Sequence, residues 1–110
     1  ESNNKKCYFL KKVSHELKLK NTKIINKTII KKNELGKFDI ITSRAFATIE
    51  KTINLTKTNT HENTKYLLLK GKASNIKKEL KDIDKNMFRY EIINQDTTKE
   101  RNIVLLCKDE

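Results

Sequence analysis

Apolar residues recur along this chain with two different spacings, and the order in which the two alternate limits its fold more than any other feature. Helical spacing predicts helices over residues 5–19, 47–57 and 75–83. Short apolar runs predict strands over residues 38–43, 66–69, 88–93 and 103–107, with a shorter β-rich segment at 22–26. This alternation is typical of an α/β fold with a largely parallel sheet. Only the polar stretch 94–102 joins the last two strands, so we expect them to close the sheet as an antiparallel hairpin.

The same spacings predict which side chains face the core. Phe9, Leu10, Val13 and Leu17 share one side of the first helix, and we expect that side to be buried. The strand at 38–43 has a nearly continuous apolar middle, which is typical of a strand covered on both faces.

In the second helix, Ile49 and Ile53 share a side with two threonines, Thr52 and Thr56. Threonine is a weak helix former, so this helix depends on packing of that side.

The charge of the chain is strongly basic and unevenly distributed. Lysine and arginine number 25 against 14 acidic residues, which gives a formal charge of +11. Residues 1–37 carry 11 lysines against the three acids Glu1, Glu16 and Glu34. A basic segment attracts nucleic-acid phosphates by releasing counterions, although a solvated lysine-rich surface would give the same count. Charge alone therefore leaves nucleic-acid binding open.

Several classes of protein are disfavoured by what the sequence lacks. No apolar run approaches the length of a membrane span and no signal peptide is visible, so we expect no membrane partner. Cys7 and Cys107 lie far apart, and neither shows metal-ligand spacing with His15 or His61. Two buried, reduced thiols in a cytoplasmic protein are the expectation, without a metal site.

The loops that follow the predicted strands carry short motifs, and others precede them near residue 1. They are an acid-led run Glu1-Ser2-Asn3-Asn4-Lys5-Lys6 followed by Phe9-Leu10, then Glu16-Leu17-Lys18-Leu19-Lys20-Asn21, Ser43-Arg44-Ala45-Phe46-Ala47, Leu69-Lys70-Gly71, and Glu100-Arg101 before Ile103-Val104. In this order they resemble motifs of the RsmG (GidB) family, which methylates N7 of a guanine in 16S ribosomal RNA.

The resemblance implies a class I S-adenosylmethionine-dependent methyltransferase fold with a Rossmann-like sheet. It implies that residues 1–110 form the C-terminal part of a single methyltransferase domain, whose N-terminal segment and glycine-rich cofactor loop are absent from the sequence. We therefore expect an incomplete sheet. The implied cofactor is S-adenosyl-L-methionine, and the implied partner is 16S ribosomal RNA or the small-subunit particle. We expect the protein to be a monomer.

The resemblance assigns the cofactor to residues that follow the expected strands, at their carboxyl ends. Glu1 stands where a Rossmann-like sheet places its ribose-binding acid, with Ser2 and Asn3 beside the adenosine. For the isolated chain, the alternative is that Glu1 is a frayed terminal residue. Ile29 and Ile30 align with the adenine-contacting pair, although the family usually has an acid where this chain has Ile30. Ordinary helix-start residues remain the alternative reading.

Arg44 is the strongest candidate for the site. It follows a buried strand between small neighbours, and its planar guanidinium suits carboxylate or phosphate groups. The resemblance places the matching arginine at the cofactor. The alternative is an ion pair with Asp39 or Glu50. We expect Phe46, two residues later, to lie in the core.

Contacts to RNA are expected from basic side chains. Lys70 ends a strand at the same edge and could pair with phosphate or cap the surface, and Arg101 lies in the polar hairpin. The first helix adds four lysines that we expect to be exposed: Lys5, Lys11, Lys12 and Lys18. No catalytic residue is expected, because the N7 lone pair of guanine needs no base to attack a methyl group. The alternative function is a basic RNA-binding or decayed module without methyl-transfer activity.

Overall fold

The computed structural model describes residues 1–98 and 100–108. The chain divides into two compact units, Glu1–Ile30 and Lys31–Glu110, and each is described by itself. Within the described residues, no helix is long and apolar enough to cross a membrane.

The first unit contains one helix, α1 (Asn4–Glu16), whose start is capped by the Asn3 side chain. The helix ends three residues earlier than predicted, and Lys18 adopts a positive φ of 54° just beyond its end. The segment 22–26, expected to be β-rich, forms no strand. The Ile25 carbonyl accepts a hydrogen bond from the amino group of Glu1 and one from the N–H of Lys27, and neither bond belongs to a strand pairing.

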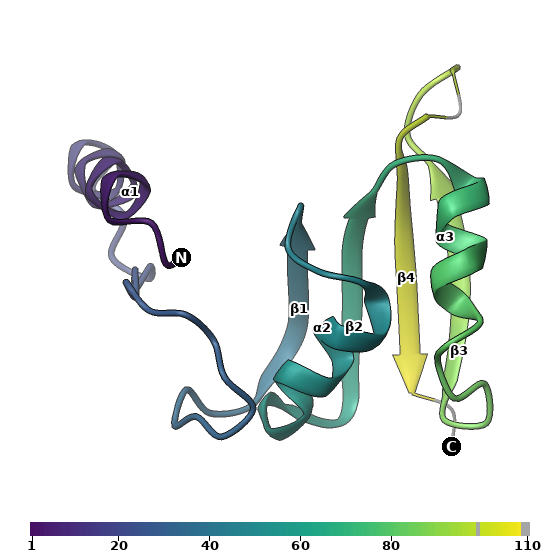
Figure 1. Cartoon of the computed structure of the whole chain (residues 1–110). Helices are drawn as coiled ribbons and strands as arrows, with labels where there is room; N and C mark the ends of the chain where they lie inside the picture. The colour runs from purple at the N-terminus through teal and green to yellow at the C-terminus, as the bar shows by residue number, and fades with distance from the viewer. Residues whose placement is uncertain (99, 109–110) are drawn as a thin grey trace. The chain divides into compact units, whose positions relative to one another are not determined.

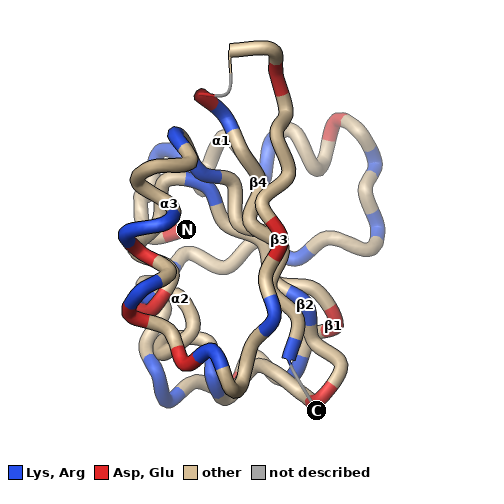
Figure 2. The backbone as a smooth tube through the Cα atoms, turned by 90° about the vertical axis from the view of Figure 1, so that its right-hand side faces the viewer, with Lys and Arg blue, Asp and Glu red and all other residues tan. Residues whose placement is uncertain are grey.

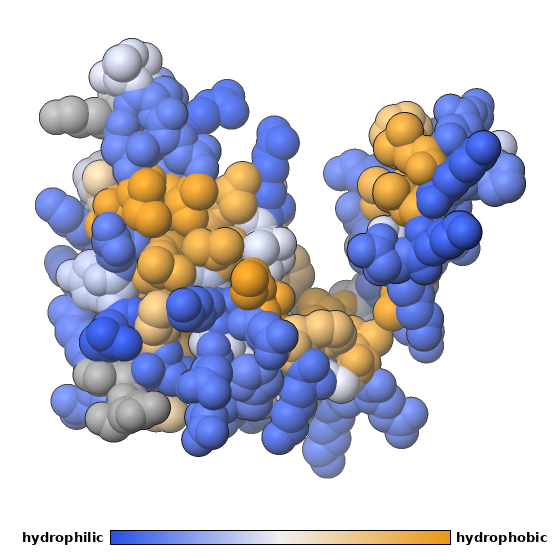
Figure 3. Space-filling view, turned by 180° about the vertical axis from the view of Figure 1, so that it is seen from behind, coloured by the Kyte–Doolittle hydropathy of each residue, from blue (hydrophilic) through white to orange (hydrophobic). Residues whose placement is uncertain are grey.

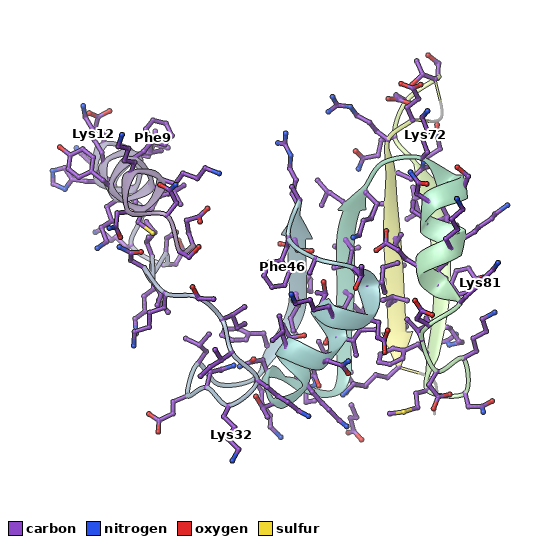
Figure 4. The ribbon with its side chains drawn as sticks, viewed as in Figure 1. Phe9, Lys12, Lys32, Phe46, Lys72 and Lys81 are labelled. Atoms are coloured by element: carbon purple, nitrogen blue, oxygen red, sulfur yellow. The ribbon has the colours of Figure 1, made fainter. Side chains whose placement is uncertain are left out.

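The apolar side of α1 was predicted to be buried, but it is exposed. Phe9 is 63% and Leu17 65% exposed, Leu10 is also exposed, and Cys7 is the fully buried residue of the helix. Residues 1–30 hold a single helix and no strand, so this unit has no second layer to cover that side. Figure 4 shows the Phe9 ring projecting from α1.

The second unit is a mixed four-stranded sheet with two helices and a short 3-10 helix. Its elements are β1 (Phe38–Arg44), α2 (Ile49–Thr56), η1 (Lys57–Asn59), β2 (Thr60–Lys70), α3 (Ala73–Leu80), β3 (Phe88–Asn94) and β4 (Asn102–Lys108). The strand order is β1-β2-β4-β3, with β1 and β2 parallel. Strand β4 runs antiparallel to both β2 and β3.

The predicted antiparallel hairpin is confirmed by β3 and β4. The prediction of a largely parallel sheet is confirmed only in part. Three strands point the same way, but one of the three pairings is parallel. The difference arises because β4 returns from the hairpin and inserts between β2 and β3. Strand β2 also begins six residues before its predicted start, in the polar stretch 60–65.

The helices α2 and α3 cover one face of the sheet, as Figure 1 shows. Under them lies a core of nine buried side chains: Ile49, Tyr66, Leu68, Ile76, Leu80, Ile83, Phe88, Val104 and Leu106. Charged residues of both signs alternate along the outer side of α3 (Figure 2). Ile49 of α2 belongs to this core and Ile53 packs against it, so α2 is buried on the side that its sequence predicted.

The threonines of α2 are buried but keep their hydrogen bonds. The Thr52 hydroxyl donates to the Thr48 carbonyl over 2.8 Å, and the Thr56 hydroxyl donates to the Thr52 carbonyl over 2.7 Å. Thr56 also shares a 2.7 Å hydrogen bond with the Tyr66 hydroxyl. Burial raises the pKa of Tyr66, against the opposing effect of that bond. These bonds satisfy the polar groups that α2 brings into the core.

The opposite face of the sheet is uncovered in this unit. Side chains alternate along a strand, so the neighbours of the core residues point the other way. They include apolar residues that are exposed or half-buried: Ile40, Leu67, Leu69, Ile93, Ile103 and Leu105. Figure 3 shows hydrophobic side chains gathered over this face. The prediction that 38–43 is covered on both faces is wrong here, because β1 is an edge strand with Ile40 55% exposed.

Both cysteines are free thiols. Cys7 is buried, as expected, whereas Cys107 on the uncovered face is half-buried. Among the described residues, no group of three or more His, Cys, Asp or Glu side chains could hold a metal ion.

Candidate functional site

A cleft of about 610 Å³ lies where β1 and β2 end and β4 begins. Its lining residues come from three loops: Arg44, Ala45, Phe46, Ala47, Leu69, Lys70, Gly71, Gln95, Glu100 and Arg101. In α/β sheets, ligands bind at the carboxyl ends of parallel strands. The structure therefore brings Arg44, Lys70 and Arg101, predicted separately from the sequence, to one site.

The loop after β1 turns sharply at Ala45, whose φ is +50°. This left-handed conformation is unusual for a residue with a side chain. The next residue, Phe46, is 46% exposed and lines the cleft, so the prediction that it is a core residue is wrong. It sits on the connection before α2, outside the layer that α2 and α3 bury. Figure 4 shows its ring projecting from this connection.

Arg44 is exposed at the end of β1. Among the described residues its guanidinium has no hydrogen bond or ion pair. The suggested partner Asp39 is instead paired with His61 Nε2 over 2.6 Å, at the opposite end of the strand. The ion-pair alternative for Arg44 is thus not what the structure forms, and its cationic group is available at the cleft.

Lys70 is largely buried and already bonded. Its Nζ donates to the Ala47 carbonyl over 2.6 Å and to Glu79 Oε1 over 3.0 Å. Only 16% of the Lys70 side chain is exposed. Its ammonium therefore joins the loop after β1 to α3. Glu79 was not singled out from the sequence, where it is one of several charges on a surface helix.

The loop after β2 is fixed against the start of β4. Asn102, which is buried, donates from Nδ2 to the Gly71 carbonyl over 2.9 Å. The N–H of Gln95 donates to the Arg101 carbonyl over 3.0 Å, which closes the hairpin loop. Gln95 and Glu100 thereby join the cleft. Glu100 belongs to a recognised motif, but nothing in the sequence distinguished Gln95 within its polar stretch.

The remaining predicted cofactor residues belong to the first unit. The Glu1 carboxylate accepts from the Asn3 N–H over 3.1 Å, and this hydrogen bond lowers its pKa. The Asn3 side chain accepts from the Lys6 N–H over 3.0 Å, a capping role that the sequence reading missed. Ser2 is exposed, Ile29 is half-buried and Ile30 is 59% exposed.

The amino group of Glu1 donates to the Ile25 carbonyl over 3.2 Å. The start of the chain therefore lies beside the segment that precedes Ile29. Glu1 is held here by its backbone, and its carboxylate is ionised and exposed to solvent.

The four lysines expected on the first helix are exposed, as predicted. Lys11 and Lys18 also line a second cavity, of about 510 Å³, together with His15 and Lys20. Lys18 contributes from beyond the helix end rather than from its face.

Comparison with known proteins gives a consistent result. The family model GidB, described as rRNA small subunit methyltransferase G, matches residues 1–104. The ribosomal RNA small subunit methyltransferase G of Brachyspira hyodysenteriae is 39% identical over 111 residues, which cover 96% of this chain and 52% of that relative. The proteins of the same description from Acinetobacter baumannii and Acinetobacter baylyi are 41% and 42% identical over 76 residues, covering 64% of this chain and 35% of each relative. The chain thus spans about half the length, or less, of these curated relatives.

Proposed function

This chain belongs to the GidB family of small-subunit ribosomal RNA methyltransferases, and we propose that it forms the C-terminal part of an enzyme that methylates N7 of a guanine in 16S ribosomal RNA. The observation that carries the proposal is the cleft at the strand ends, where Arg44, Phe46 and Arg101 meet. A cation that has no partner within residues 1–98 and 100–108, an exposed aromatic ring and a second cation suit an anionic, base-containing ligand.

The proposed fold is a class I methyltransferase sheet, of which this chain supplies four strands. Two features of the second unit support it. Strand β1 lies at the sheet edge and is paired on one side, so a further parallel strand can join it. The apolar face opposite α2 and α3 is uncovered, and α/β sheets normally carry helices on both faces. We propose that the rest of one domain completes this edge and this face.

The proposed cofactor, S-adenosyl-L-methionine, supplies an electrophilic methyl group when bound. The described residues fit such a ligand. The ionised Glu1 carboxylate can accept hydrogen bonds from ribose hydroxyls, and Ser2 and the backbone of Asn3 lie next to it. Ile29 and Ile30 offer apolar surface to the adenine. The guanidinium of Arg44 suits the carboxylate of the methionine part.

Recognition of RNA falls to the aromatic and basic side chains. The Phe46 ring can stack on an extruded base, and Arg101 can neutralise a phosphate beside it. Lys5, Lys11, Lys12 and Lys18 add exposed positive charge on the first unit. The N7 atom of guanine carries a lone pair, so these residues need only align the base and exclude water. This explains how a site without a general base could perform the reaction.

A methyl-transfer assay on the complete protein tests this proposal. Labelled S-adenosyl-L-methionine and 16S ribosomal RNA should yield 7-methylguanosine, detected after digestion to nucleosides. RNA transcribed with 7-deazaguanosine is the matched control, because it lacks the accepting atom. Tight, salt-dependent RNA binding without any methyl transfer would refute the enzyme and favour a basic RNA-binding module.

The role of the lysines on and just beyond α1 can be measured separately. Changing Lys5, Lys11, Lys12 and Lys18 to Glu should make the plot of the logarithm of RNA affinity against the logarithm of salt concentration less steep. Its slope should fall by about 0.7 to 0.9 for each phosphate contact that is lost. The same change at four lysines on or beside α3 (Lys72, Lys77, Lys78 and Lys81) is the control for net charge alone. Equal slopes for the two variants would show that α1 makes no specific contribution.

A further inference from the structure

Three hydrogen bonds meet at the side chains of Lys70, which lines the cleft, and Glu79, which lies next to it. Glu79 Oε1 accepts from Lys70 Nζ over 3.0 Å and from the Ile49 N–H over 2.9 Å. Lys70 Nζ also donates to the Ala47 carbonyl over 2.6 Å. The two side chains thus connect β2 and α3 to both ends of a short loop segment, residues 47–49.

The position of these hydrogen bonds makes them stronger than bonds at an exposed surface. Lys70 and Glu79 are 16% and 23% exposed, so solvent screens the pair less than it screens a surface ion pair. The Ile49 N–H belongs to the first turn of α2, where no carbonyl within the helix can accept from it. A carboxylate there also interacts favourably with the positive end of the helix dipole. Glu79 therefore caps α2 from another helix, in addition to the local cap of Thr48.

The two side chains of interest at the cleft lie just before this tethered segment. Phe46 directly precedes Ala47, whose carbonyl Lys70 holds, and Arg44 lies two residues before Phe46. Ala45 between them has a left-handed backbone. A strained loop persists only where its surroundings fix it. The bonds of Lys70 and Glu79 supply such a constraint within a few residues of both side chains.

We propose that Lys70 and Glu79 are positioning residues, which act through the loop after β1 to hold Arg44 and Phe46 in the geometry needed at the cleft. The inference rests on the proposed function for its effect on catalysis. It assigns Lys70 to loop positioning, whereas the sequence left phosphate pairing and surface capping open. Neither side chain needs to touch the cofactor or the RNA.

Variants of the complete protein test the inference. Glu79→Gln and Lys70→Met each remove the charge pair with little change in size, and the double variant removes both charges. Lys72→Met, two residues from Lys70 and exposed, is the matched control, with Glu62→Gln for Glu79. The measurements are kcat and KM for methyl transfer, thermal unfolding, the salt dependence of RNA affinity, and hydrogen exchange of the backbone amides from Phe46 to Ile49.

Both single variants should lower kcat on the order of tenfold or more, because misplacing a site residue by about 1 Å can cost a hundredfold in rate. The double variant should be no worse than either single one, since both changes break one unit. Lys70→Arg should recover part of the rate by keeping the charge. Exchange of the Ile49 amide should accelerate in Glu79→Gln, while the salt dependence of RNA affinity stays unchanged.

Two results would overturn the positioning role. A changed salt dependence in Lys70→Met with a normal rate in Glu79→Gln would make Lys70 a phosphate contact. Normal kcat in the folded fraction of every variant would leave the pair purely stabilising. Absence of methyl transfer by the unaltered protein would instead refute the proposed function, and the Ile49 exchange rates would still decide whether the pair holds the loop.

Discussion

The two ends of the β1–β2 pair differ in whether their polar side chains are bonded within the fold. At the carboxyl end, Arg44 has no bonding partner among the described residues, and Phe46 beside it is exposed. At the amino end, the Thr64 hydroxyl donates to the Phe38 carbonyl over 2.6 Å, and His61 pairs with Asp39. Polar groups that hold a fold together are satisfied within it. The carboxyl end therefore offers its groups to a ligand, whereas the amino end uses them for structure.

Asn59 shows the contrast most clearly. It is the buried last residue of η1, directly before β2, and forms a reciprocal amide pair with Asn33, with distances of 2.7 and 2.9 Å. Its Nδ2 also donates to the Gly36 carbonyl over 2.8 Å. At the other end of the sheet, the Lys70 side chain is likewise bonded within the fold. Substitutions at the two ends should accordingly separate activity from stability.

The largest effect is expected at Arg44. In the complete protein, Arg44→Ala should lower methyl transfer by about 2.7–4 kcal/mol of transition-state stabilisation, as for loss of one oriented donor in a closed site. Its thermal stability should change little, because the side chain makes no bond within the described residues. Arg44→Lys should recover the rate only partly, since ammonium keeps the charge but loses the planar fork. Cofactor affinity, rate and unfolding temperature measured together check this.

Two outcomes would contradict the proposed contact between Arg44 and the cofactor. Normal cofactor affinity with a lost rate would mean that Arg44 contacts the RNA instead. A large fall in stability, with normal activity in the folded fraction, would make it a structural residue like those at the amino end.

An intermediate effect is expected at Asn59, and on stability alone. Asn59→Ala should lower the free energy of unfolding by about 1–3 kcal/mol, because it leaves buried polar groups without partners. The activity of the folded fraction should stay normal. Urea unfolding followed by circular dichroism measures the change, with Asn63→Ala on the exposed part of β2 as control. Loss of activity beyond the unfolded fraction would show that the two ends are coupled.

The smallest effect is expected at Asp39. Its side chain is 92% exposed, and the partner His61 is charged only when protonated. Asp39→Asn should therefore change the free energy of unfolding by less than about 1 kcal/mol, as is usual for exposed pairs. A comparison of unfolding midpoints at low and high salt measures it. A larger loss would mean that the edge of β1 depends on this pair for its register.

Much of this site could be predicted because the recognised motifs lie next to the ends of predicted strands in the sequence. Arg44, Lys70 and Arg101 each follow or precede an apolar run, so the edge of the sheet that they share was predictable. The exposure of Phe46 was not, because an aromatic residue next to a strand has the same local pattern whether a helix covers it or not. The partnership of Glu79 with Lys70 depends on how α3 packs beside α2, which no local spacing encodes.

The sequence by itself determined where the three α-helices and the centres of the four strands lie, the side of α2 that is buried, and the closing hairpin. Periodicity is a local property, and the spacing of apolar residues is sufficient to specify it. Only the tertiary structure decided that β4 lies between β2 and β3, and that the apolar side of α1 and the second face of the sheet stay uncovered. A pattern states which side of an element prefers to be buried, but burial needs a partner layer, and that partner comes from elsewhere in the fold.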